Sequence, residues 1–146
     1  MTEPSDLHGT WHLTRWDYTI DGEFQGYSMG EDARGQIIYS PDGHMSAILS
    51  ENERPRHDAA AFHRAEPEER DAAARSYVSY GGSWDLADEV VTHHVAFALF
   101  PNWPGTDLIR EVSWDGETLI LTGVPETSAT GRVVVNRLFW ERAPKR

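Results

Sequence analysis

Residues 80–110, YGGSWDLADEVVTHHVAFALFPNWPGTDLIR, form the stretch that decides the fold of this chain. Within it, bulky apolar side chains alternate with small or polar ones in three runs separated by turn residues. Such alternation predicts β-strands that turn one face toward a closed interior. Two of these strands carry His93 and Arg110 among the apolar positions. A polar group of this kind is costly to bury unless something pairs with it, so the pattern indicates a pocket.

Turn residues divide the rest of the chain into short, evenly spaced strands, a pattern typical of a β-sandwich or a barrel. Asp21-Gly22, Pro41-Asp42-Gly43 and Asp115-Gly116 mark the tight turns. The expected strands are 11–20, a short piece at 24–27, 35–40, 44–50, 80–87, 90–100, 106–114, 117–124 and 132–142. We therefore expect an all-β fold with roughly eight antiparallel strands, the number at which a closed barrel fills its interior or holds one small ligand.

The segment from Glu51 to Val78 departs from this pattern because it is charged and rich in alanine. Pro67 suits the first turn of a helix, and the acidic pair Glu68-Glu69 is favourable near a helix N-terminus. We expect one helix from Pro67 to about Tyr77, preceded by a mobile loop. The charges are either a solvated face or part of a lid that covers one end of the barrel.

The first hairpin fixes which side chains point inward. The Pro41-Asp42-Gly43 loop fits a three-residue connection, which pairs Tyr39 with Met45. Cross-strand partners share a face, so His44 and Ser46 point outward. The inward set is Ile37, Tyr39, Met45, Ala47 and Leu49.

Cross-strand pairing also sets the faces of the later strands. A two-residue turn at Asp115-Gly116 pairs Arg110 with Leu121 and Val112 with Leu119, which gives Arg110 an apolar face. On the preceding strands the bulkier alternating sets are the better inward candidates. These sets are Tyr80, Trp84 and Leu86 on one strand, and Val91, His93, Val95, Phe97 and Leu99 on the next.

The chain resembles the bacterial lipocalin-like domain family within the wider calycin group. The resemblance rests on Gly9-Thr10-Trp11 with Leu13, 35–47, Tyr80-Gly81-Gly82, His93, Pro101-Asn102-Trp103 with Gly105, Arg110 and 138–142. It covers nearly the whole chain and implies an up-and-down barrel with one α-helix across an end and an internal ligand cavity. The length of 146 residues fits a single domain over 1–146. In calycins the first-strand Trp closes the opposite end beneath a basic residue from the last strand, and Trp11 and Arg142 match these roles. Arg15, on the face of Trp11 and Leu13, is not transferred from the family.

His93 and Arg110 are the candidates for chemistry. The unperturbed pKa of histidine, near 6.5, lets a pocket move His93 either way around neutrality, although a lone inward histidine is more often a hydrogen-bonded core residue. A guanidinium keeps its charge, so Arg110 requires a carboxylate, carbonyls or an anionic ligand. A buried ion pair with Glu141 or Asp85 is the alternative to a ligand.

Aromatic and amide side chains complete the expected site. Tyr39 and Tyr80 can donate to a ligand carbonyl, and Asn102 and Trp103 suit the rim of a cavity that takes a planar organic molecule. Trp103 could equally plug the end of the barrel. The expected ligand-binding residues are Tyr80, Trp84, Met45, Phe97, Asn102 and Trp103, and the expected catalytic residues are His93, Arg110 and Tyr39.

Composition excludes several classes of function. The 146 residues carry a net charge of −11, which argues against nucleic acid or an anionic membrane as partner. Cysteine is absent, His93 and His94 face opposite sides of a strand, and no phosphate loop or dinucleotide fingerprint occurs, so we expect neither metal nor cofactor. The N-terminus lacks the pattern of a signal peptide, and no apolar run is long enough for a membrane helix. We expect a cytoplasmic protein, with a homodimer among the open alternatives.

Two functions remain. One is a cofactor-free isomerase, cyclase or lyase that acts on a cyclic or polyketide-like molecule, with His93 as acid/base, Arg110 polarising a carbonyl or holding an enolate, and tyrosines orienting the substrate. The other is a non-catalytic carrier or sensor of a small hydrophobic ligand. The cost of burying both Arg and His favours the enzyme slightly, because hydroxyls alone would suffice to anchor a ligand.

Overall fold

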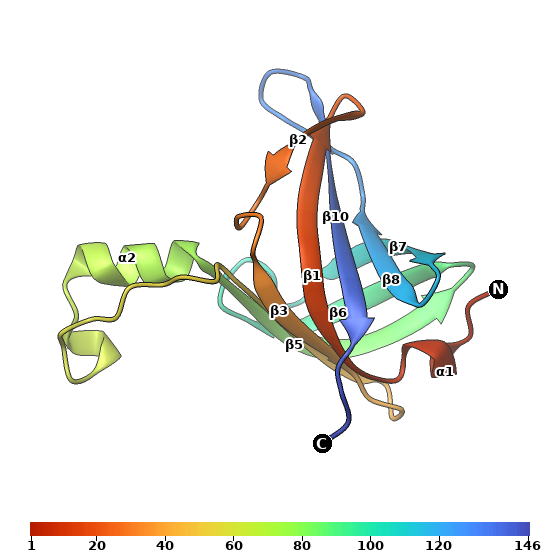
Figure 1. Cartoon of the computed structure of the whole chain (residues 1–146), viewed down its shortest axis with the longest axis horizontal. Coiled ribbons are helices and arrows are strands. Elements are labelled where there is room, and N and C mark those ends of the chain that lie inside the picture. Colours follow the sequence, from red (N-terminus) through yellow and green to blue (C-terminus); the bar gives the residue numbers. More distant parts are fainter.

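Eight antiparallel strands close into a barrel in the computed structural model, which describes residues 1–146 (Figure 1). The barrel order is β1-β3-β4-β5-β6-β7-β8-β10, and β10 pairs with β1 to complete the ring. The barrel strands are β1 (Gly9–Ile20), β3 (Arg34–Tyr39), β4 (His44–Ser50), β5 (Tyr77–Ala87), β6 (Val90–Ala98), β7 (Asp107–Asp115), β8 (Thr118–Gly123) and β10 (Val133–Arg142). The predicted all-β, lipocalin-like barrel is therefore confirmed.

Shorter elements lie at the margins of the barrel. Strand β2 (Glu23–Tyr27) pairs with the second half of β1, and β9 (Glu126–Thr127) pairs with the start of β10. Helix α1 (Pro4–Leu7) and the 3-10 turn η1 (Phe62–Arg64) were not expected from the sequence. No helix in the structure is both long enough and apolar enough to cross a membrane.

Helix α2 (Pro67–Arg75) begins where the sequence predicts, with Pro67 in its first turn and a capping box between Glu66 and Glu69. It ends two residues earlier than expected because the backbone turns into β5 at Tyr77. Figure 1 shows α2 and the loop before it projecting sideways from the barrel. No residue of 51–76 lines the interior cavity, so the helix does not cover an end of the barrel in this structure.

The β3–β4 register is the predicted one, with Tyr39 opposite Met45 and Ile37 opposite Ala47. The β7–β8 register differs by two residues, because Arg110 lies opposite Gly123 and Val112 opposite Leu121. The loop is Gly116-Glu117, with the positive φ at Gly116 in the first loop position, so Asp115 remains in the strand. A shift of two preserves the face, and Arg110 and Val112 still point inward with Leu121.

Two bulges reverse the alternation of side chains where the sequence predicts none. In β6 the register steps from Val95 opposite Gly82 to Phe97 opposite Gly81, so Ala96 is an extra residue. Phe97 is consequently 77% exposed, and Ala98 packs on the core in its place. A Cβ at Gly82 would lie 1.9 Å from the carbonyl oxygen of His94, which explains why glycine occupies this position.

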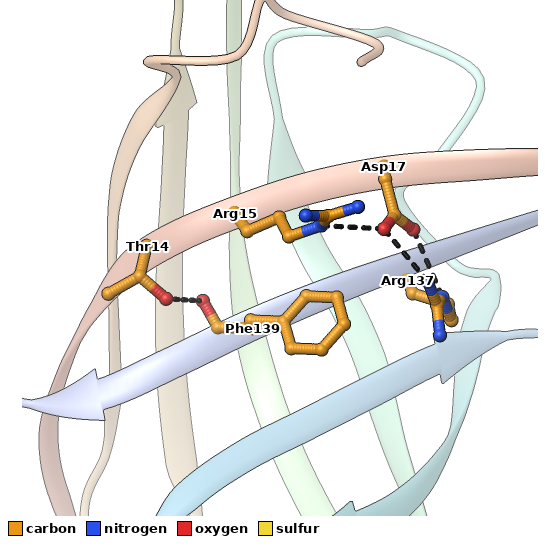
Figure 2. A network of polar contacts seen from close by, with 5 residues as sticks. All are labelled: Thr14, Arg15, Asp17, Arg137 and Phe139. Atoms are coloured by element: carbon orange, nitrogen blue, oxygen red, sulfur yellow. Dashed lines mark hydrogen bonds and ion pairs between the residues drawn. The ribbon is translucent and has the colours of Figure 1, made fainter. Parts of the chain in front are cut away.

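The second bulge is at Thr14 in β1, where the register with β10 shifts between Leu13 and Arg15. The sequence predicts Arg15 on the face of Trp11 and Leu13. This prediction is wrong, because the bulge turns Arg15 to the opposite face. It lies on the outside, where Arg15 and Arg137 hold the fully buried carboxylate of Asp17 at 2.7 Å and 2.9 Å (Figure 2). Burial alone would raise the pKa of Asp17, but the hydrogen bonds from Arg137 and Arg15 lower it.

Candidate functional site

An interior cavity of about 430 Å³ occupies one half of the barrel and is lined by residues of all eight barrel strands, of β9 and of the loops at its mouth. Of its 19 lining residues, 13 are hydrophobic. Among the lining residues Val124 is exposed and Val78 and Trp103 are half-buried, so we take their side of the cavity as its mouth. Such a volume and lining are typical of a site for one small organic molecule.

His93 lies at the inner end of this cavity between two tyrosines. The Tyr39 hydroxyl lies 2.6 Å from Nε2, and the Tyr80 hydroxyl lies 2.9 Å from Nδ1. The three residues come from β3, β5 and β6, and each is more than nine-tenths buried. The prediction that they share the interior is confirmed, and both ring nitrogens of His93 are occupied by protein hydroxyls.

This network is uncharged at neutral pH. Burial, together with the positive charge of Arg110, lowers the pKa of His93 to about 3. Burial raises the pKa of Tyr39 well above its usual value and also raises that of Tyr80, where Arg110 opposes the effect. A neutral imidazole has one N–H and one acceptor nitrogen, so one tyrosine donates to the ring and the other accepts from it.

The surroundings decide which tyrosine donates. Tyr39 is fully buried and bonds only to His93, so its proton has no acceptor other than Nε2. Nδ1 then carries the hydrogen and donates it to the oxygen of Tyr80. The proton of Tyr80 is left to point into the cavity that this residue lines. The network therefore offers a ligand one hydroxyl donor.

Arg110 lines the same cavity from β7 and has no carboxylate within 4.0 Å. Its one hydrogen bond runs from Nη1 to the carbonyl oxygen of Ile109, at 3.0 Å. The alternative of an ion pair with Glu141 or Asp85 is wrong: Asp85 lies outside the barrel, 2.7 Å from His94. Arg110 thus keeps most of its five N–H donors for water or a ligand.

Three further residues of the lining escaped prediction from the sequence. Trp16 follows the β1 bulge and donates its indole N–H to Oδ1 of Asn136, at 2.9 Å. Trp140 lines the cavity from β10, and its buried indole N–H has no hydrogen-bond partner. Alternation along the last strand, with Asn136, Leu138 and Trp140 on one face, was the signal that could have revealed two of them.

The expected ligand-binding residues divide into three groups. Tyr80 and Trp103 line the cavity, and their rings meet edge to face at 5.5 Å. Trp84 and Met45 are buried in the core below it and do not line it. Phe97 faces outward because of the β6 bulge, and Asn102 is exposed in the loop between β6 and β7.

The opposite end of the barrel is closed by Trp11 and Arg142. The guanidinium carbon of Arg142 lies 4.3 Å from the centre of the Trp11 ring, and its nitrogens donate to the carbonyl oxygens of His8 and Asp6. The Trp11 indole donates to the carbonyl of Leu7 in α1, at 2.9 Å. These contacts match the end-closing roles that the family resemblance implies.

Comparison with known proteins finds a matching family model and similar proteins. The family model of the lipocalin-like domain matches residues 8–143, from the start of β1 to the end of β10. The 4'-hydroxy-3'-methoxypropiophenone carrier protein ppsC of Aspergillus oryzae (strain ATCC 42149 / RIB 40) is 29% identical over an alignment of 109 residues, and the match covers 69% of this chain and 98% of that protein. The crystal structure of a lipocalin-like protein from Bacteroides uniformis ATCC 8492 aligns with a TM-score of 0.49 at 14% identity, over 94% of this chain and 99% of that one.

Proposed function

Because this chain belongs to the lipocalin-like domain family, we propose that it carries or senses one small, largely apolar organic molecule in the barrel. The observation that supports this most is the interior cavity of about 430 Å³, with its apolar walls and a few polar groups. A relative whose name describes a carrier of an aromatic ketone adds support. We propose an aromatic or cyclic ligand, since Trp16, Trp103 and Trp140 offer flat apolar surfaces.

The state of His93 favours a carrier over an acid/base enzyme. A general base or acid works best with a pKa near the operating pH, whereas the pKa of His93 is lowered to about 3. Both ring nitrogens are also engaged by Tyr39 and Tyr80, so a ligand reaches the histidine only through a hydroxyl. We therefore assign His93 the role of orienting the Tyr80 hydroxyl.

A cofactor-free isomerase, cyclase or lyase is the second candidate. It draws support from the free donors of Arg110 and the Tyr80 hydroxyl, both of which line the cavity and suit a carbonyl that gains negative charge. In this proposal Arg110 polarises the carbonyl and Tyr80 donates to it. The substrate is a cyclic or polyketide-like compound.

A binding experiment with 4'-hydroxy-3'-methoxypropiophenone tests the proposal, because three tryptophans of the lining report occupancy by fluorescence. Gly123→Phe places a ring in the cavity, since a Cβ there has its nearest neighbour at an ordinary 3.7 Å. Thr122→Phe adds the same ring on the opposite face of β8 and serves as the control. Wild type and Thr122→Phe should bind, whereas Gly123→Phe should not.

The fate of the compound separates the two candidates. Recovery of unchanged ligand after long incubation supports a carrier or sensor, and a new product that requires Arg110 supports the enzyme. Binding that persists in folded Gly123→Phe would place the ligand outside the barrel and contradict both.

A further inference from the structure

The polar groups that line the inner part of the cavity are all hydrogen-bond donors. The Tyr80 hydroxyl proton is free because Nδ1–H of His93 already donates to its oxygen. Arg110 has one protein acceptor, and the buried Trp140 N–H has none. Asn136 accepts from Trp16 and from Ser28 through Oδ1, so its amide NH₂ is left over. A ligand that satisfies this lining must bring acceptors.

Trp140 makes the shortage of acceptors costly for the protein. It is 2% exposed, and its indole nitrogen is the one buried side-chain polar atom in the structure without a partner. Native proteins pair nearly all such groups, and an unpaired buried donor needs an explanation. A bound ligand that brings an acceptor atom to the Trp140 N–H provides this explanation.

Charge at the site favours an anionic acceptor. No carboxylate lies within hydrogen-bond reach of Arg110, and its positive charge acts on His93, Tyr39 and Tyr80. Two carboxylates do line the cavity, Asp107 and Glu126, but both are exposed, and Asp107 is bound to His94 at 2.7 Å. The −11 charge of the chain is spread over a solvated surface and screened by salt, whereas Arg110 acts at contact distance.

The backbone leaves room for the anionic group beside Arg110. Gly123 is the cross-strand partner of Arg110, and its missing side chain would have pointed into the cavity. On the other side of Gly123, the backbone carbonyl oxygen of Asn136 lies 3.7 Å from the place of a Cβ, and Asn136 itself lines the cavity. Arg110 and Asn136 therefore flank a gap on the cavity wall, each with donors to spare.

We infer that the cavity selects a ligand whose apolar ring body carries an oxyanion, either a carboxylate or an ionised phenol or enol, which lies at Gly123 between Arg110 and Asn136. This inference rests on the proposed function and specifies its ligand class. Further acceptors of the ligand meet the Tyr80 hydroxyl and the Trp140 N–H.

A matched pair of probes tests the charge. Isothermal titration calorimetry with 2-naphthoate and methyl 2-naphthoate compares the same ring with and without the anion. Wild type should bind the acid on the order of tenfold to a hundredfold more tightly than the ester, as expected for hydrogen bonds to a charged group. Arg110→Met should remove this preference while still binding the ester, which also shows that the variant folds. Arg56→Met deletes an exposed charge and should behave as wild type.

The possible outcomes distinguish a failure of the inferred ligand class from a failure of the proposed function. Equal binding of acid and ester by wild type, or a preference that survives in Arg110→Met, would overturn the inference and leave a carrier of neutral ligands. If neither probe binds, or if both bind equally well to Gly123→Phe, the proposed function itself fails.

A third probe distinguishes the two sources of the oxyanion. The visible absorbance of 4-nitro-1-naphthol reports its ionised fraction, and binding next to Arg110 should lower its pKa by roughly one unit or more. A shift that depends on Arg110 indicates that phenols and enols are accepted. A preference for naphthoate without such a shift restricts the ligand to carboxylic acids.

Discussion

At the scale of single residues, the chemistry of the cavity depends on which N–H and O–H groups of its side chains are free to donate hydrogen bonds to a ligand. His93 gives both nitrogens to tyrosines, and the fixed tautomer that follows passes one donor to the ligand through Tyr80. Tyr39 thus affects the ligand only indirectly, by setting the tautomer of His93. Arg110 is the one charged group on the inner wall, and its effect extends to the pKa of all three partners in the network.

The lowered pKa of His93 predicts a pH dependence of stability. A histidine whose pKa is about 3 when folded and about 6.5 when unfolded favours the folded state above pH 6.5. Below pH 6.5 the unfolded chain binds a proton at this histidine that the folded chain does not, so the contribution of His93 to the free energy of unfolding falls as the pH falls. Between pH 6.5 and pH 5 this contribution should cost roughly 1.5–2 kcal/mol, measured by urea denaturation.

His93→Gln isolates this contribution because glutamine bonds to both tyrosines without titrating. The slope between pH 6.5 and pH 5 should be flatter in the variant by the amount given above. Asp17 does not interfere in this window, since its own pKa lies below the usual value and its contribution is lost only in more acid solution. Parallel slopes in the two proteins would contradict the buried, neutral state of His93.

At the scale of elements, the alternation of side chains and the turn residues were enough to predict all eight barrel strands and the start of α2. They also place Tyr39, Tyr80, His93 and Arg110 in one interior, because side chains two residues apart on a strand point to the same face. A bulge shifts this alternation by one residue, and neither Thr14 nor Ala96 has a side chain that marks a bulge. This is why alternation predicts the wrong face for Phe97 and Arg15 and does not reveal Trp16.

The direction of α2 and the partners of Arg110 lay beyond prediction for a different reason. Both depend on contacts between segments far apart in the sequence, and the alternation within one strand contains no such information. The prediction that Trp84 and Met45 point inward is confirmed. Whether an inward residue packs in the core or lines the cavity depends on its depth in the barrel, which follows from strand tilt and closure.

The bulge in β6 should depend on Gly82. A Cβ there would meet the backbone of His94 and of Ala96, and no flexible side chain is available to move aside. Gly82→Ala should therefore lower the free energy of unfolding by about 3 kcal/mol or more, as other severe backbone clashes do. Urea denaturation measures the change.

Gly26→Ala in β2 is the control for that experiment. The nearest neighbours of its Cβ are side-chain atoms of Tyr18 at 3.8 Å and 3.9 Å, and its φ is not positive. It should change stability by no more than about 0.5–1 kcal/mol. A Gly82→Ala variant as stable as Gly26→Ala would mean that the bulge is not required.

At the scale of the whole molecule, the two ends of the barrel have separate tasks. One end is packed by Trp11, Leu7 and Arg142 and contributes no residue to the cavity. The other end is open, with Trp103 at its rim and the lateral arm of 51–76 outside it (Figure 1). Stability and ligand affinity should therefore respond to different substitutions, even though both depend on the same eight strands.

A pair of tryptophan variants tests this separation. Trp11 is 1% exposed, so Trp11→Ala should cost about 3–5 kcal/mol of stability, as the loss of a large buried aromatic side chain does. Affinity for a ligand should stay close to the wild-type value as long as the variant is measured well below its melting temperature.

Trp103→Ala should do the reverse, because this half-buried ring covers the cavity and packs on Tyr80 at 5.5 Å. Thermal melts and fluorescence titrations of both variants provide the measurement. Loss of affinity in folded Trp11→Ala would show that the closed end takes part in binding, and an unchanged melting temperature would show that Trp11 does not close the barrel.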